Sequence, residues 1–457
     1  SLKKDSLFIN SITGIMVMNS NGKVIASWNE DMPMLTASTM KCVTTAIALK
    51  VLKPDYKFKT QLGYTGFIEN GVLYGDLYIV GGADPTLGSF DSLAIPKDSL
   101  FLSWSNALTK EGITRINGHI VADDRFFEDE IIPSSWSWGN LGPYYGSAAS
   151  GLSFYENIQH LTLIPGKNIG DYTHIKEIFP QIPNMQYNNG VYTSGSNTPI
   201  RTSYRASNLS RVGSLSGSIP LNRDSSIITV SNKFPHLSCA MEFQKYLNNL
   251  KIYSLPEILD AKTIKSASFY ELTIINETES APVQSIVNVT NRISNNFYAE
   301  TLFKMVAKKI TGVGSYDSAK VVFNRQMEDL NLGTFGYYQE DGSGLSRQNY
   351  ISAKFMTNFF YKMKQLDIFE SFYESLPHPG GEGTLKNVLA KVPYSEKSKI
   401  RAKSGSLSGV RCYSGYVNKG RGEYLTFTIF TNNFTARTSE MQVGIEGFMN
   451  ELLKYKN

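Results

Sequence analysis

Cysteine and histidine, which build most metal and redox sites, are scarce in this chain. Only 3 cysteines and 5 histidines occur among 457 residues. An odd cysteine count gives no disulfide framework, and we expect these residues to be buried as small apolar side chains: Cys42, Cys239 and Cys412. The histidines lack the i, i+3 or i, i+4 spacing of a helical zinc site. We therefore predict no metal and no cofactor, and assign structural roles to His119, His160, His174, His236 and His378.

Long apolar runs and a marked excess of one charge are also missing. No stretch approaches the ~18 apolar residues of a membrane span, so we predict no transmembrane segment. The net charge of +5 is too small and too dispersed for a nucleic-acid partner, although it suits work beside an anionic polymer. The chain of 457 residues is longer than one core of ~250–300 residues usually organises, which predicts two or three domains.

The first residues, Ser1 to Lys4, contain neither an initiator methionine nor the apolar core of a signal peptide. We therefore expect a mature or trimmed form from which a signal peptide has been removed. The compartment then has to be inferred from function.

The two ends of the chain predict similar elements. Near the N-terminus, apolar residues flank Asn21-Gly22 within 13–27, which is typical of a β-hairpin. Residues 38–52 have the apolar spacing of a helix. Near the C-terminus, 409–431 predicts a second hairpin and 439–454 a final helix. This symmetry predicts one sheet covered by helices and built from both ends, with the middle of the chain inserted.

Three short patterns carry residues suited to acyl transfer. They stand in the order Ser38-Thr39-Met40-Lys41, Ser294-Asn295-Asn296 and Lys403-Ser404-Gly405-Ser406. A serine followed three residues later by lysine, a Ser-x-Asn and a Lys-Ser/Thr-Gly strand resemble the working parts of penicillin-binding proteins and serine β-lactamases. We therefore expect a serine nucleophile that needs no histidine.

The first pattern places a hydroxyl and an amine on one helix face. Residues three apart are neighbours there, so Ser38 and Lys41 can come within hydrogen-bond reach if a helix begins near Ser38. A buried amine near another cation loses its proton more easily, and neutral Lys41 could accept the hydroxyl proton as Ser38 attacks a carbonyl. The helix N-terminus adds N–H groups for an oxyanion. Alone, this spacing is also typical of a solvated helix face.

The second pattern precedes a helix predicted over 297–309. Serine and asparagine are both favoured N-caps, which is one interpretation of this segment. In the functional interpretation, Ser294 passes a proton from Lys41 to the leaving group, and the Asn296 amide holds the substrate backbone. The sequence alone leaves both interpretations open.

The third pattern precedes the C-terminal hairpin. Lys403 would supply a cation, while the hydroxyls of Ser404 and Ser406 would bind a terminal carboxylate. Gly405 would let the substrate backbone run close to the strand edge. The N–H of Ser406, with that of Ser38, would complete an oxyanion hole. The alternative is a Gly/Ser-rich loop that leads into a strand.

Longer segments narrow the resemblance. The run GDLYIVGGADPTL at residues 75–87 resembles a signature of the D-alanyl-D-alanine carboxypeptidase/endopeptidases, the class C low-molecular-mass penicillin-binding proteins of DacB type (peptidase family S13). Similar likenesses cover nearly the whole chain: Asp123-Asp124, Trp136-Ser137-Trp138, Tyr144-Tyr145, Asp341-Gly342-Ser343-Gly344-Leu345-Ser346-Arg347 and Gly383-Thr384-Leu385-Lys386-Asn387. Most of their Asp and Gly residues would form turns with or without catalysis, so we assign them no catalytic role.

This resemblance implies an α/β (α+β) fold with a penicillin-binding-protein/serine β-lactamase-like transpeptidase domain, split by two inserted, mainly β domains. The implied division is 1–60 and 264–457 for catalytic domain I, 61–165 and 221–263 for domain II, and 166–220 for domain III. Residues 186–232 are crowded with Ser, Asn, Gly and Thr, which predicts many short strands with turns.

The implied reaction is attack of Ser38 on a D-Ala-D-Ala peptide, release of D-alanine and hydrolysis of the acyl-enzyme, with cross-link cleavage by the same steps. Peptidoglycan stem peptides are then the partners, and β-lactams, which resemble them, are inhibitors that acylate Ser38. Such a substrate implies a periplasmic or otherwise extracytoplasmic location. The oligomeric state stays open, with a dimer among the alternatives.

The resemblance also places the substrate side chain against Trp138, Tyr145 and Arg347. Family members commonly carry acidic residues directly after the second tryptophan, able to pair with a diaminopimelate-type amino group, whereas this chain has Gly139-Asn140. Asn140 can accept a hydrogen bond, but without a charge the discrimination should be weaker. Trp138 and Tyr145 could equally be aromatic residues of the domain core.

Two other functions fit part of the pattern. A serine β-lactamase or esterase shares the Ser-x-x-Lys helix, but the large insertion fits poorly with such compact enzymes. A noncatalytic module that binds cell-wall peptides or β-lactams needs neither nucleophile nor base. The joint presence of five residues argues against that module: Ser38, Lys41, Ser294, Asn296 and Lys403.

Overall fold

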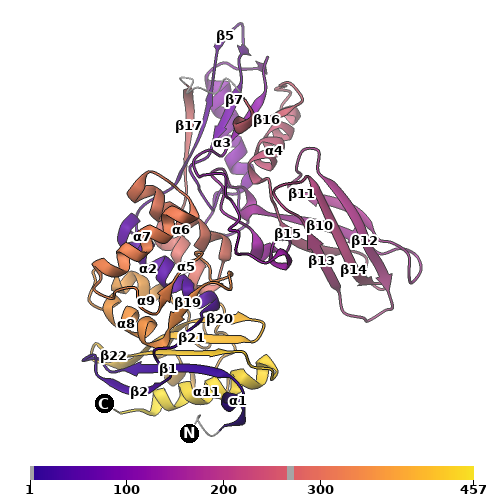
Figure 1. Ribbon diagram of the computed structural model, residues 1–457. Coiled ribbons are helices and arrows are strands. Elements are labelled where there is room, and N and C mark those ends of the chain that lie inside the picture. Colours follow the sequence, from indigo (N-terminus) through magenta and orange to yellow (C-terminus); the bar gives the residue numbers. More distant parts are fainter. Residues whose placement is uncertain (1–4, 265–271, 457) are drawn as a thin grey trace. The chain divides into compact units, whose positions relative to one another are not determined.

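The computed structural model describes residues 5–264 and 272–456. The chain divides into two compact units (Figure 1): unit 1 comprises Ser1–Tyr56, Pro133–Ser135 and Pro282–Asn457, and unit 2 comprises Lys57–Ile132 and Trp136–Ala281. Two segments lie outside the described residues: Ser1 to Lys4, where we expected a trimmed start, and 265–271, which follow the expected domain boundary at 263/264. The division into three domains stays a prediction.

A five-stranded antiparallel sheet forms the centre of unit 1, in the order β2-β1-β22-β21-β20. Its strands are β1 (Ile12–Met18), β2 (Val24–Trp28), β20 (Ile400–Leu407), β21 (Val410–Gly420) and β22 (Glu423–Asn432). β1 pairs with β22, with Ile15 opposite Ile429, so strands from both ends of the chain share one sheet. Gly22 has a φ of 79° in the first turn, which glycine adopts without steric cost. Both predicted hairpins are confirmed.

Helices cover both faces of this sheet (Figure 1). They are α1 (Ser6–Ile9) and α11 (Thr438–Lys454) on one face and α8 (Ala353–Met363) on the other. Along β1, Ile15 and Val17 join the core that includes α11, whereas Met16 and Met18 pack against Ala353 of α8. Side chains of a strand alternate between faces, so a sheet covered on both sides needs the continuous apolar run found in β1.

Helix α2 (Met40–Leu52) lies among the other helices of unit 1 and contacts α5 and α6. These helices are α5 (Val283–Arg292), α6 (Asn296–Thr311), α7 (Tyr316–Asp329), α9 (Phe369–Ser375) and α10 (Tyr394–Lys397). Every residue of α2 from 40 to 49 is buried, as expected for a helix that packs on all sides. A small sheet, β18 (Tyr337–Tyr338), β19 (Tyr350–Ser352) and β3 (Pro33–Leu35), completes the unit.

Unit 2 contains a five-stranded sheet in the order β16-β9-β7-β4-β17. Its strands are β4 (Lys59–Tyr64), β7 (Leu77–Val80), β9 (Ile120–Asp123), β16 (Ile258–Asp260) and β17 (Thr273–Glu279). The helices α3 (Lys97–Lys110) and α4 (Pro235–Asn249) share its core through Trp104 and Phe243, whose rings meet edge to face. The Trp104 indole donates a hydrogen bond of 3.0 Å to Thr278 of β17, so its polar group is satisfied in the core.

The rest of unit 2 is built from small sheets. Their strands are β5 (Phe67–Glu69), β6 (Val72–Tyr74), β8 (Arg115–Ile116), β10 (Ile158–Ile164), β11 (His174–Phe179), β12 (Gln186–Ser194), β13 (Arg201–Arg205), β14 (Val212–Pro220) and β15 (Ser226–Ser231). β11-β10-β15 and β12-β14-β13 pack around a shared core that includes Leu161, Val191 and Tyr204. The short strands predicted within 186–232 are therefore confirmed.

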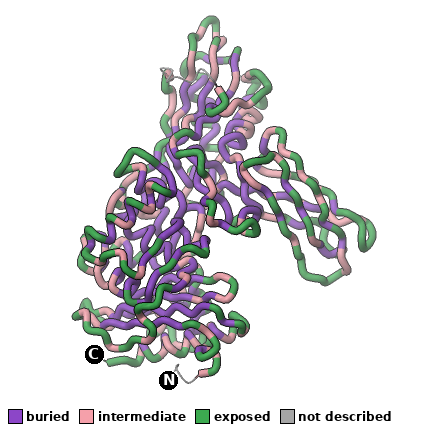
Figure 2. The backbone as a smooth tube through the Cα atoms, viewed as in Figure 1, coloured by how far each residue is buried: buried purple, intermediate pink, exposed green. Residues whose placement is uncertain are grey.

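Burial follows these layers. Buried residues, drawn in purple in Figure 2, follow the sheets and the helices packed on them, while most connecting loops are exposed. All three cysteines are buried and unpaired, as expected, and burial raises the pKa of Cys42 to about 12. Among the described residues, no helix combines the length and the apolar character needed to span a membrane.

Candidate active site

Ser38 lies in a 3₁₀ turn, η2 (Ala37–Thr39), directly before α2. The helix itself begins at Met40, two residues later than the sequence predicts. The reason is local. Ala37 has a φ of 44°, a left-handed conformation that residues other than glycine rarely adopt. The Thr39 hydroxyl also donates a hydrogen bond of 2.7 Å to the Thr36 carbonyl. Such strain gathers at functional sites.

The Lys41 amine is fully buried and meets three oxygen atoms. Its Nζ donates to Ser38 Oγ at 2.9 Å, to Asn296 Oδ1 at 2.6 Å and to the Ser343 carbonyl at 2.8 Å. The first contact is the one that the i, i+3 spacing predicts. The other two come from residues more than 250 positions away in the chain.

The Ser-x-Asn segment joins α5 to α6, and its three residues have different partners. Asn295 is the N-cap of α6, because its side chain accepts 3.1 Å from the Tyr298 N–H. Ser294 has a φ of 64°, and its hydroxyl accepts from Lys403 Nζ at 2.9 Å. The cap interpretation therefore fits Asn295, whereas Ser294 and Asn296 each contact a lysine.

Lys403 lies on β20, a fully buried side chain at the edge of the sheet. Besides Ser294, its Nζ donates 2.8 Å to the Ser404 carbonyl. The tetrapeptide that could have been a loop is thus part of a strand. The five residues proposed as catalytic form two linked groups, one centred on Lys41 and one on Lys403.

The two lysines differ in how easily they lose a proton. Burial, with the positive charge of Lys403 as the next cause, lowers the pKa of Lys41 well below its usual range. Burial lowers the pKa of Lys403 to about 8. Because the charge of Lys403 favours the neutral form of Lys41, we expect Lys41 to serve as the base and Lys403 as the cation of one site.

Gly405 brings the serine turn against the strand. A Cβ at this position would lie 2.6 Å from the Thr36 carbonyl oxygen and 3.0 Å from the Ser38 nitrogen. The space beside this glycine is therefore occupied by the turn that carries Ser38. Its proposed contact with substrate stays a prediction.

Replacing Gly405 with alanine is expected to displace this turn. Overpacking of this kind lowers the free energy of unfolding by about 1–3 kcal/mol. Acylation of Ser38 should also slow, because the backbone N–H of Ser38 is displaced. Urea unfolding and the rate of penicillin acylation measure both effects. Gly447→Ala in α11 is the matched control, since no atom lies within 4 Å of its Cβ position. Equal behaviour of the two variants would contradict the packing role of Gly405.

Sequence reasoning missed two groups beside Lys41. One is the Ser343 carbonyl, which no side-chain pattern can reveal. The other is Glu300 of α6, fully buried, whose carboxylate accepts from the Gly342 N–H at 3.0 Å and the Ser343 N–H at 2.8 Å. An acidic residue four positions after Asn296, on the same face of the predicted helix, was the available signal.

The remaining predicted residues have varied surroundings. Ser404 is buried and Ser406 is exposed on β20, while Arg347 donates 3.0 Å to the Ser408 carbonyl. Trp138, 59% exposed, and Tyr145, 37% exposed, lie in short 3₁₀ turns of unit 2, so the alternative that they are core aromatics is wrong. Their binding roles, and that of Asn140, stay predictions.

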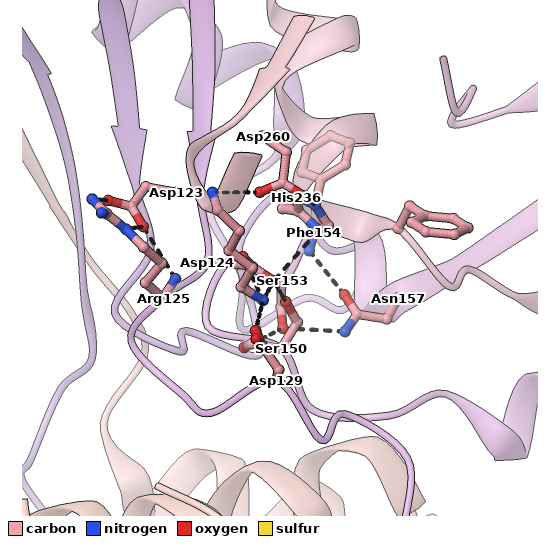
Figure 3. A network of polar contacts seen from close by, with 12 residues as sticks. Asp123, Asp124, Arg125, Asp129, Ser150, Ser153, Phe154, Asn157, His236 and Asp260 are labelled. Atoms are coloured by element: carbon pink, nitrogen blue, oxygen red, sulfur yellow. Dashed lines mark hydrogen bonds and ion pairs between the residues drawn. The ribbon is translucent and has the colours of Figure 1, made fainter. Parts of the chain in front are cut away.

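A second polar cluster lies in unit 2 (Figure 3). Among the described residues, three side chains offer atoms that could bind a metal ion and that lie within 4.8 Å of one another: Asp124, His236 and Asp260. His236 lies 3.6 Å from Asp124 and 3.3 Å from Asp260, and Lys262 lies 2.9 Å from Asp124. Lys262 also lies 2.8 Å from Asp129, so two carboxylates share its ammonium, and the contacts of the cluster join α4 to β16 and to the residue that follows β9. Its members come from separate elements, so spacing in the sequence could not reveal it.

Comparisons with known proteins agree with this architecture. The sequence model of the D-Ala-D-Ala carboxypeptidase 3 (S13) family matches residues 2–452. A D-alanyl-D-alanine carboxypeptidase of Actinomadura sp. is 25% identical over 94% of this chain and 80% of its own. The D-alanyl-D-alanine carboxypeptidase DacB of Haemophilus influenzae is 25% identical over 97% of this chain and 92% of its own.

Solved structures show the same fold. The crystal structure of penicillin binding protein 4 (dacB) from Haemophilus influenzae has a TM-score of 0.85 and 23% identity, covering 99% of each chain. The same protein complexed with a β-lactam has a TM-score of 0.82 and 22% identity, also covering 99% of each chain. The α+β fold expected from the sequence, with a penicillin-binding-protein-like architecture, is confirmed.

Proposed function

Because the chain belongs to the D-Ala-D-Ala carboxypeptidase 3 (S13) family, we propose that Ser38 is the nucleophile of its serine DD-peptidase activity. The enzyme cleaves D-Ala-D-Ala termini and D-Ala-containing cross-links of peptidoglycan stem peptides through an acyl-enzyme. One observation carries this assignment: a buried amine, Lys41 Nζ, lies 2.9 Å from Ser38 Oγ. The contact supplies a base beside a nucleophile without any histidine.

Acylation then proceeds in a balanced sequence. Neutral Lys41 accepts the hydroxyl proton of Ser38 while its oxygen forms a bond to the carbonyl carbon of the penultimate D-alanine. The C–N bond breaks, and the departing amine takes the proton that Lys41 accepted, with the Ser294 hydroxyl as its proposed carrier, so that Lys41 is neutral again. Water then attacks the ester with Lys41 again as base, which releases the shortened peptide and restores Ser38.

The third pattern is proposed to bind the charged end of the substrate. Lys403 stays protonated near neutral pH and holds Ser294, so it provides a fixed positive charge at the edge strand. The hydroxyls of Ser404 and Ser406 would bind the terminal carboxylate. Backbone N–H groups of Ser38 and Ser406 would stabilise the oxyanion. Cross-linked peptides use the same residues with a different leaving group.

Incubation with penicillin and with a pentapeptide ending in D-Ala-D-Ala tests this function. We expect one covalent adduct per chain by intact mass, mapped to the peptide that contains Ser38, and free D-alanine from the pentapeptide. An adduct that is hydrolysed as fast as it forms would favour the serine β-lactamase alternative. Binding with neither an adduct nor D-alanine release would favour the noncatalytic module.

The substrate also sets the proposed location and partners. Peptidoglycan lies outside the cytoplasm, so we place the enzyme in the periplasm or another extracytoplasmic space. β-Lactams would be inhibitors, consistent with the β-lactam complex of the Haemophilus influenzae protein. A dimer stays one alternative for the oligomeric state, and sedimentation velocity would decide it.

A further inference from the structure

The direction of the Lys41 lone pair decides whether this residue can act as a base. A neutral amine has two N–H donors and one lone pair, whereas three oxygen atoms surround Lys41 Nζ. The Ser343 carbonyl oxygen and Asn296 Oδ1 can accept hydrogen bonds but cannot donate them. When Lys41 is neutral, these two oxygens take both N–H donors. The lone pair is then left facing the Ser38 hydroxyl, which is the one neighbour that can donate.

The Ser343 carbonyl can perform this task only if its peptide is fixed. Glu300 accepts from the N–H groups of Gly342 and Ser343, one to each carboxylate oxygen. Asp341 accepts from the N–H groups of Gly344 and Ser346 at 2.7 and 2.6 Å. Asp341 thus holds the peptide that carries the Ser343 carbonyl, through the Gly344 N–H, and Glu300 holds the two peptides before it.

Packing leaves this loop little room to move. A Cβ at Gly342 would collide with the Ala299 carbonyl of α6, and one at Gly344 would collide with the Ala37 carbonyl of the serine turn. Gly344 also has a φ of 81°, which favours glycine. The loop thus lies between the helix that carries Glu300 and the turn that carries Ser38.

We infer that Glu300 is a positioning residue, which holds the two peptides directly before the Ser343 carbonyl so that this carbonyl aims the Lys41 lone pair at Ser38. This inference rests on the proposed function, since it assigns Lys41 the role of base. Glu300 itself touches neither Ser38 nor Lys41 in the described hydrogen bonds. Its effect passes through one backbone carbonyl.

The charges around Lys41 give the inference a second readout. The titratable groups that act on Lys41 are Lys403 of β20, Glu300 of α6, Asp341 of the loop and Cys42 of α2. Burial and Asp341 raise the pKa of Glu300 to about 8, while its two N–H donors favour the ionised form. The Ser343 carbonyl accepts a hydrogen bond from protonated Lys41 and so stabilises it, and Glu300 adds to this stabilisation where Glu300 is ionised. Displacement of the Ser343 carbonyl should therefore lower the pKa of Lys41.

The test compares Glu300→Gln with Glu340→Gln by measuring penicillin acylation rates across a wide pH range. A glutamine at 300 turns an NH₂ group toward one of the two N–H donors, so the backbone of Gly342 and Ser343 should shift and carry the Ser343 carbonyl with it. We expect the maximal rate to fall about 10- to 100-fold, the size of a lost hydrogen bond to a charged group. The acid limb of the profile should move to lower pH.

Glu340→Gln is the matched control, since Glu340 is also buried beside this loop but contacts Lys320 and Tyr338. It should keep the wild-type profile. A merely structural role of Glu300 would lower the acylation rate without moving the acid limb of the pH profile, and that result would overturn the inference. A wild-type pH profile in Glu300→Gln would overturn it as well. If the glutamine variant fails to fold, Glu300→Asp takes its place, since it keeps the carboxylate but is shorter by one methylene. A wild-type acylation rate in Glu300→Asp would then overturn the inference. Absence of acylation in the wild-type protein would instead refute the proposed function.

Discussion

Alanine at position 38 is expected to abolish the penicillin adduct and to lower D-alanine release by about 10⁴-fold or more. The reason is that no other group could form the acyl-enzyme, because Ser38 is the hydroxyl within 2.9 Å of Lys41 Nζ. Intact mass after penicillin exposure and a coupled assay for D-alanine measure the two effects. The change removes one oxygen from a turn, so folding should be kept.

Ser105→Ala is the control for this substitution. Ser105 is a buried serine of α3 whose hydroxyl donates 3.0 Å to the Leu102 carbonyl, and its removal should leave both assays at the wild-type level. Release of D-alanine at equal rates by Ser38→Ala and the wild-type protein would refute the assignment of Ser38. An adduct mapped to another residue would do the same.

The contacts of the site that the sequence could predict are those encoded by side-chain type and local spacing. Ser38 and Lys41 meet because residues three apart share a face, and Asn295 caps α6 as its residue type favours. The contact of Ser294 with Lys403, 109 residues away, was not predicted, since the sequence interpretation placed Ser294 between Lys41 and the leaving group. The 3₁₀ turn before α2, with its left-handed Ala37, was not predicted, because no glycine marks that conformation in the sequence.

The fold shows the same limit. The hairpins at both chain ends have local signals, such as Asn21-Gly22, and their strands could be placed from the sequence. The parallel pairing of β12 with β14 depends on contacts across many residues, and no local pattern carries that information. In the site, the Ser343 carbonyl has no side-chain signature, so Glu300 could not be linked to Lys41 in advance.

The cost of burying two ammonium groups explains why the site is so densely hydrogen-bonded. Lys41 and Lys403 are both fully buried, and an unpaired buried charge is strongly destabilising. Oxygen atoms from three separate segments surround Lys41 Nζ. The Ser294 hydroxyl and the Ser404 carbonyl accept hydrogen bonds from Lys403 Nζ. Mutual repulsion of the two charges then favours loss of the Lys41 proton. The same burial that opposes folding prepares the base.

Methionine at position 41 is expected to lower the acylation rate by about 10²- to 10⁴-fold, the usual contribution of a general base. Methionine has a similar length and suits a buried site, but it cannot accept the Ser38 proton. The measurement is the rate of penicillin acylation, with thermal unfolding to confirm that the variant folds. Lys50→Met on the same helix, which removes a lysine that contacts Gln326 at 2.6 Å, should keep the wild-type rate.

The pH profile separates a base from a fixed cation at position 41. In the wild-type protein the rate should rise with pH as Lys41 loses its proton, at a pKa well below that of an ordinary lysine, and fall again as Lys403 loses its charge near pH 8. Lys41→Met should lose the rising limb and keep the fall. If the residual activity of Lys41→Met still rose along the wild-type acid limb, another group would be the base, and the role of Lys41 would be limited to holding Ser38 in place.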